Sequence, residues 1–126
     1  MDTNIYLVDL NTVGMGDIEQ VGGKNASLGE MLQNLTQLGI RIPNGFIITV
    51  AAYREFIRYN NLDEGIHSVI NQINFDEIES LRRGGLQARQ LLKNAKFPKE
   101  LSEAIIEKYY ELSKTYGQEM TDVAVR

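Results

Sequence analysis

A lysine that follows two glycines, just before an apparent helix start, is the group in this sequence best suited to hold an anion. Gly22, Gly23 and Lys24 stand in the run VGGKNASLGE. Glycines let backbone N–H groups approach an anion closely, the first turn of a helix offers unpaired N–H donors, and lysine adds a full charge. The pattern suits a phosphate-binding turn, although the three residues taken alone would more often form a structural turn with a solvated lysine.

Two better-known phosphate motifs are excluded by the residues around this turn. A Walker loop needs a glycine six residues before the lysine and a Ser or Thr after it, where this chain has Ile18 and Asn25. Gly14 and Gly16 do not form a dinucleotide fingerprint either, because the third glycine would fall at Glu19. Any phosphate site here must therefore be of another kind.

The wider run of residues closely resembles the start of the phosphoenolpyruvate synthase (pyruvate, water dikinase) family. Order and spacing match, and the resemblance implies that residues 1–126 are the N-terminal portion of a nucleotide-binding domain of the ATP-grasp type, truncated at its C-terminal end, with no second domain. Pyruvate phosphate dikinase and rifampin phosphotransferase share this domain and are the near alternatives. The matching segments are Val21–Met31, Leu38–Ile40, Ile42–Phe46, Thr49, Ala52–Tyr53, Phe56 and Val123–Arg126.

The resemblance also implies a reaction and a role for particular residues. The family converts ATP, pyruvate and water to AMP, phosphoenolpyruvate and phosphate through a phosphohistidine on another domain. By resemblance Lys24 and Arg126 contact the ATP phosphates, with Gly22, Gly23 and Asn25 in support. A frayed arginine in solvent is the alternative for Arg126. We expect no catalytic residue in this chain and no turnover by it alone.

The other ionisable groups are expected to be ordinary surface side chains without a role in binding or catalysis. The single histidine, His67, lacks the family's Thr-x-His-like context and is expected to be an ordinary surface or half-buried side chain. Magnesium is implied as a cofactor beside ATP, but the family's metal-binding acids belong to the later half of the domain. We expect solvated helix faces for the arginines and glutamates that could suggest other sites: Arg82, Arg83, Arg89, Glu100, Glu103, Glu107 and Glu111.

Composition sets the broad class. With 126 residues, 43% of them hydrophobic, the chain can build one domain with a core. A net charge of −4 argues against a nucleic-acid surface, so any anion must be held by local groups. There is no cysteine, no basic signal-peptide start and no apolar run long enough for a membrane span. We expect a cytoplasmic protein whose partners are ATP and the remaining domains of a parent enzyme, without membrane contact.

The elements expected from periodicity give a mostly helical α+β fold. Short strands are predicted at 5–10, 46–49 and 123–126, with a loop over 11–20. The first helix should follow the glycine turn, or begin later if Ser27 and Glu30 form a capping box, which would leave Lys24 on a loop. Its expected buried face is Leu28, Met31, Leu32, Leu35 and Leu38.

Glycines and caps set the expected ends of the remaining helices. Gly39 and Gly117 should each end a helix, Thr49 should cap the next one, and Gly84-Gly85 should break or kink the helix that contains them. A non-catalytic helical interaction module with a purely structural glycine-lysine turn remains the alternative function.

Overall fold

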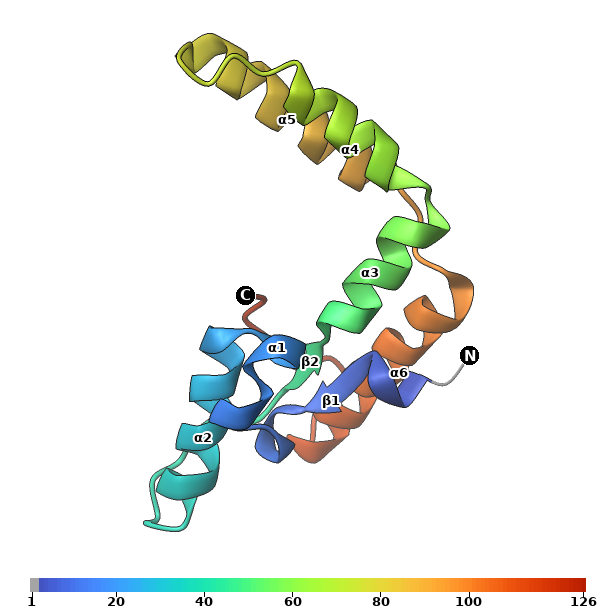
Figure 1. The fold of residues 1–126 in the computed structure, drawn as a ribbon. Helices are drawn as coiled ribbons and strands as arrows, with labels where there is room; N and C mark the ends of the chain where they lie inside the picture. Colours follow the sequence, from blue (N-terminus) through green and yellow to red (C-terminus); the bar gives the residue numbers. More distant parts are fainter. Residues whose placement is uncertain (1–2) are drawn as a thin grey trace. The chain divides into compact units, whose positions relative to one another are not determined.

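The computed structural model describes residues 3–126, which divide into two compact units (Figure 1). The first unit comprises the chain up to Tyr53 together with Lys99–Arg126, and the second comprises Arg54–Pro98. The mostly helical α+β class is confirmed. The helices and strands are β1 (Leu7–Asp9), α1 (Ile18–Val21), α2 (Gly23–Thr36), β2 (Phe46–Ile48), α3 (Val50–Tyr59), α4 (Leu62–Asn71), α5 (Ile78–Asn94) and α6 (Lys99–Thr115).

Two of the three expected strands form, and they pair with each other. β1 and β2 are antiparallel, with Leu7 opposite Ile48 and Asp9 opposite Phe46. The third prediction was wrong: residues 123–126 are not a strand, and Val125 is 91% exposed. A strand needs a neighbour to satisfy its backbone groups, and within residues 3–126 the sheet consists only of β1 and β2.

The core of the first unit forms where α2 packs on the segment that follows β1. The side of α2 that faces this core carries the buried residues Ala26, Gly29 and Leu32. An added Cβ at Gly29 would overlap the backbone of residues 10 and 13, so the absence of a side chain lets the two segments approach closely. The core side chains are Leu10, Val13, Val21, Ala26, Leu32 and Ile47.

The predicted buried face of α2 was therefore only partly right. Leu32 is buried and Leu28 packs partly against the core, but Met31 is 48% exposed and Leu38 is 74% exposed. Periodicity weighs large apolar side chains, whereas this contact uses small ones. Ala26 and Gly29 turn inward because they permit the closest backbone approach.

The expected helix ends and the threonine cap are confirmed. At the end of α2, Gly39 has φ +79°, and the Ile40 N–H donates to the Leu35 carbonyl at 3.1 Å. This satisfies a carbonyl that the helix leaves unpaired. Gly117 ends α6 with φ +67° in the same way. The Thr49 hydroxyl accepts the Ala52 N–H at 3.4 Å at the start of α3.

Two predictions about irregular segments were wrong. Residues 11–20 are not simply a loop, because they contain the 3₁₀ turn Met15–Asp17 and α1. Gly84 does not break α5, which runs continuously from Ile78 to Asn94. A Cβ on the buried Gly84 would overlap the Ile73 side chain, so this glycine lets the segment after α4 pack closely on α5. That packing offsets the helix cost of glycine, about 1 kcal/mol.

The close contact at Gly29 predicts that Gly29→Ala destabilises the chain although alanine is the better helix former. The new methyl group would meet backbone carbonyl oxygens, which cannot move aside as a flexible side chain can. We expect a loss of about 1–3 kcal/mol in the free energy of unfolding, the usual range for overpacking. Urea denaturation followed by circular dichroism measures it.

Gly85→Ala is the matched control. Gly85 also lies inside a helix, but its added Cβ would meet only the guanidinium end of Arg89. This variant should be neutral or more stable by up to about 1 kcal/mol. Equal effects of the two substitutions would contradict the proposed packing at Gly29.

Candidate anion-binding site

A single residue joins α1 to α2, and its backbone requires glycine. Gly22 has φ +82° and ψ 159°, a region that side-chain-bearing residues rarely adopt. Its N–H donates to the Ile18 carbonyl at 2.8 Å, and its carbonyl accepts the Ala26 N–H at 3.0 Å. Gly22 therefore belongs to the last turn of one helix and the first turn of the next, which fixes the direction in which α2 starts.

Lys24 lies in the first turn of α2, since the helix begins at Gly23. The later start with a Ser27–Glu30 capping box is wrong. Both side chains bond instead to Met15: the Ser27 hydroxyl contacts its sulfur at 3.5 Å, and a Glu30 carboxylate oxygen accepts its N–H at 3.1 Å. The first-turn N–H groups of α2 lack intrahelical acceptors, and no acidic residue stands in that turn.

The side chain of Asn25 makes a hydrogen bond across the junction between α1 and α2. Its side-chain amide donates to the Val21 carbonyl at 2.9 Å, which satisfies a carbonyl at the end of α1. This bond ties α1 to α2 in addition to the covalent link through Gly22. Asn25 therefore contributes to the shape of the turn through its side chain, and its supporting role in phosphate binding stays a prediction.

The four residues expected to bind the nucleotide line one hollow. Lys24 and Arg126 meet there although they stand at opposite ends of the sequence, and Gly22 and Gly23 form part of the wall. The hollow has a volume of about 740 Å³. Its remaining lining residues are Val21, Asn25, Ser27, Leu28 and Met31.

Charge in this hollow is positive. Lys24 and Arg126 are both exposed, and neither forms an ion pair with another residue in the described part of the chain. No acidic side chain is among the lining residues of the hollow. Two unneutralised cations beside free helix N–H groups attract an anion with more than one charge. The local sign is thus opposite to the net charge of −4.

Leu28 and Met31 also line this hollow, a position that sequence reasoning did not predict. They follow Lys24 on one side of α2 and form an apolar wall of the hollow. Their helical spacing looked like that of a core face, and no signal in the sequence separates an apolar wall from a core stripe. The hollow can therefore contact apolar surface beside the charge it attracts.

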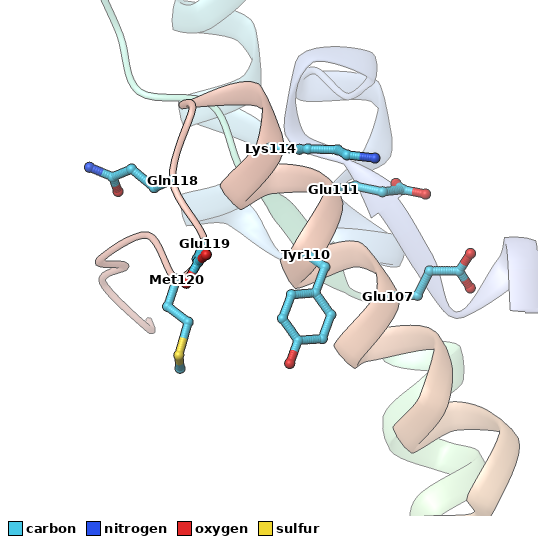
Figure 2. A pocket seen from close by; sticks show the side chains of 7 residues that line it. All are labelled: Glu107, Tyr110, Glu111, Lys114, Gln118, Glu119 and Met120. Carbon is cyan, nitrogen blue, oxygen red and sulfur yellow. The ribbon is translucent and has the colours of Figure 1, made fainter.

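A second hollow, of about 800 Å³, lies beside the C-terminal half of α6 (Figure 2). Three carboxylates and one ammonium group line it, so it would repel a phosphate. Figure 2 shows that Glu107 and Glu111 extend from α6 while Glu119 lies on the following turn, so the acids do not converge. Its lining residues are Glu107, Tyr110, Glu111, Lys114, Gln118, Glu119 and Met120.

The acidic row on α6 and the arginines on α5 behave as exposed helix faces. Glu103 lies 3.7 Å from Lys99, Glu111 lies 3.4 Å from Lys108, and Arg82 pairs with Glu79 at 3.1 Å. Among residues 3–126, no three His, Cys, Asp or Glu side chains are grouped so that they could hold a metal ion.

His67 is an exposed residue of α4, as expected. Its Nδ1 donates to the Asp63 carbonyl one helical turn earlier, at 2.9 Å. The ring thus makes a local helix contact, and it does not line the hollow that contains Lys24.

Lys108 connects α6 to the sheet within the first unit. Its ammonium group donates to the Asp9 carboxylate at 3.1 Å, and this hydrogen bond raises the pKa of Lys108. Since the pair is partly exposed, its contribution to stability is small. The pair is a contact between α6 and the end of β1. In the described part of the chain, no helix has the length and apolar character to cross a membrane.

Comparison with known proteins identifies the family. The profile of the family described as "Pyruvate phosphate dikinase, AMP/ATP-binding domain" matches residues 18–126. The phosphoenolpyruvate synthase of Aquifex aeolicus (strain VF5) is 44% identical over 117 residues, which cover 93% of this chain and 14% of that protein. That of Pseudomonas aeruginosa (strain UCBPP-PA14) is 40% identical, covering 96% of this chain and 15% of the relative.

A third relative, the phosphoenolpyruvate synthase of Escherichia coli (strain K12), is 40% identical over 82% of this chain and 13% of its own length. The chain thus spans about one seventh of the curated relatives it matches. The family profile, in contrast, covers all but the first 17 residues. The chain therefore belongs to the pyruvate phosphate dikinase AMP/ATP-binding domain family.

Proposed function

We propose that the chain is the ATP-binding segment of a phosphoenolpyruvate synthase, and that Lys24 and Arg126 hold the ATP phosphates. The observation that carries the proposal is the hollow in which two unpaired cations meet the first turn of α2. Membership of an AMP/ATP-binding family names the class of anion that such a hollow would take. The segment would be the first part of a domain of the ATP-grasp type in a cytoplasmic enzyme.

The two cations suit different parts of the task. Lys24 presents a compact point charge, whereas the planar guanidinium of Arg126 can bind two phosphate oxygens at once. Phosphoryl transfer spreads negative charge over phosphate oxygens, and the main contribution of a protein is to neutralise and position them. Gly22 and Gly23 would let backbone N–H groups reach the same oxygens.

The rest of the proposed reaction belongs to the parent enzyme. It would convert ATP, pyruvate and water to AMP, phosphoenolpyruvate and phosphate through a histidine on another domain. Among residues 3–126 no acidic cluster suits magnesium, so its ligands would come from other parts of the parent. The lining residues of the hollow include no nucleophile with an adjacent base, and the role proposed for this segment is binding alone.

The binding free energy that two cations can supply limits how tightly the segment alone could bind ATP. Two charge-assisted contacts contribute about 1.5–3 kcal/mol each. Even a millimolar dissociation constant requires about 4 kcal/mol, before the cost of ordering the ligand. We infer that tight ATP binding needs contacts from the remainder of the nucleotide-binding domain.

Lys24→Ala in the intact synthase should raise the dissociation constant for ATP about ten- to a hundredfold, because one charge-assisted phosphate contact is lost. Isothermal titration calorimetry with ATP measures the change. Lys93→Ala is the matched control, since Lys93 is an exposed lysine on α5 and should leave ATP binding unchanged. Wild-type affinity in Lys24→Ala would instead favour the non-catalytic interaction module.

The purified 126-residue chain should not produce AMP from ATP and pyruvate, because the phosphohistidine and the pyruvate site lie elsewhere in the proposed parent. Its affinity for ATP should be millimolar or weaker, for the reason given above. Chromatographic detection of AMP and an ATP titration followed by NMR provide the two readouts. Production of AMP by the isolated chain would contradict the proposal that catalysis requires other domains of the parent enzyme.

A further inference from the structure

Glu30 makes a hydrogen bond across the first unit that helix formation does not require. Its carboxylate oxygen Oε2 accepts the Met15 N–H at 3.1 Å, fifteen positions earlier in the chain. Met15 begins the 3₁₀ turn Met15–Asp17, and this turn leads directly into α1. The bond thus fastens the segment before α1 to the middle of α2.

Gly14 provides the space for this carboxylate. Its φ of −151° is extended backbone that any residue can adopt, so no conformational reason requires glycine there. A Cβ at this position, however, would overlap Glu30 Oε2. The Gly14 N–H donates to the Asp17 carboxylate at 2.9 Å, which closes the 3₁₀ turn from its other side. The Glu30 carboxylate thus occupies the space that a side chain at position 14 would need.

The segment held in this way ends at the anion-binding turn. From Met15 it passes through α1 to Gly22, which is joined covalently to α2 and whose carbonyl accepts the Ala26 N–H at 3.0 Å. Residues 15–22 are therefore attached to α2 near both ends: by the contacts of Glu30 and Ser27 with Met15 at one end, and by the Gly22 junction and the Asn25 bond to the Val21 carbonyl at the other. If the Glu30 contact is released, the Met15 backbone loses its hydrogen bond to α2, while the Gly22 junction, the Asn25 bond and the core packing of Val21 remain.

We propose that Glu30 is a positioning residue for the phosphate site. By holding Met15 it contributes to how α1 approaches α2, and so to where the Gly23 N–H lies relative to the Lys24 ammonium; the Gly22 N–H is occupied by the Ile18 carbonyl. Glu30 does not line the hollow, and it acts on a bound anion through the backbone. The inference rests on the proposed function, since it concerns the ATP phosphates.

The test uses ATP titrations of the intact synthase with substitutions on both sides of the contact. Glu30→Ala removes the acceptor, and Gly14→Ala displaces it; each should raise the dissociation constant for ATP about three- to tenfold, which is within the range of one ordinary hydrogen bond. The double variant should be no weaker than either single one, because both remove the same contact. Glu30→Gln keeps an oxygen acceptor and should restore affinity to within about twofold of wild type.

Gly16→Ala is the matched control for Gly14→Ala. It places a methyl group on the same turn, where an added Cβ meets nothing within 4 Å. ATP affinity should be unchanged in this variant. A tenfold loss in Gly16→Ala would mean that the turn tolerates no side chain at all, and it would overturn the specific role of Glu30.

Amide hydrogen exchange supplies a readout that does not depend on ATP. Glu30→Ala and Gly14→Ala should speed exchange in residues 15–24 while the α6 amides keep their wild-type rates. A merely structural role would raise exchange throughout the first unit and lower the melting temperature without changing the ATP affinity of the folded enzyme. That pattern would overturn the proposal, as would additive losses in the double variant.

The Lys24→Ala titration separates this inference from the function on which it rests. If Lys24→Ala weakens ATP binding and the Glu30 and Gly14 variants do not, the phosphate site stands and the positioning role of Glu30 is wrong. If none of the variants affects ATP binding, both proposals fail.

Discussion

The close approach of α2 to the backbone of residues 10–13, at Gly29, is the constraint on which the candidate site depends. Because Gly29 has no side chain, the carbonyls of Leu10 and Val13 can lie directly against the helix. That contact places Val13 and Ala26 in one core and brings the following turn within reach of Glu30. The turn then leads through α1 to the anion-binding junction. The packing contact at Gly29 thus influences the position of the exposed Lys24 side chain.

Charge and packing are divided between the two sides of α2. The inward side carries Ala26, Gly29 and Leu32 and no charge. Lys24 at the helix start lines the hollow together with Met31 and the partly buried Leu28. Arg126 adds the second cation from the far end of the sequence. The local arrangement concentrates positive charge in a chain that is acidic overall, which is what selective binding of a polyanion requires.

Local signals in the sequence predicted the parts of the fold that depend on local physics. Gly39 and Thr49 act at helix ends as expected, since backbone conformation and capping bonds involve near neighbours. Predictions failed where distant segments decide the outcome. Gly84 is accommodated by its packing on Ile73, and Met31 is exposed because Gly29 takes the inward position. For the candidate site, the order of the glycines and the lysine predicted the turn, whereas the role expected for Arg126 came from family resemblance alone.

A structure of the intact synthase bound to a non-hydrolysable ATP analogue tests the central claim most directly. The account predicts phosphate oxygens within hydrogen-bonding distance of Lys24 Nζ and the Arg126 guanidinium, with the Gly23 N–H directed at the same phosphates. A triphosphate bound elsewhere, with Lys24 and Arg126 both left in solvent, would contradict it.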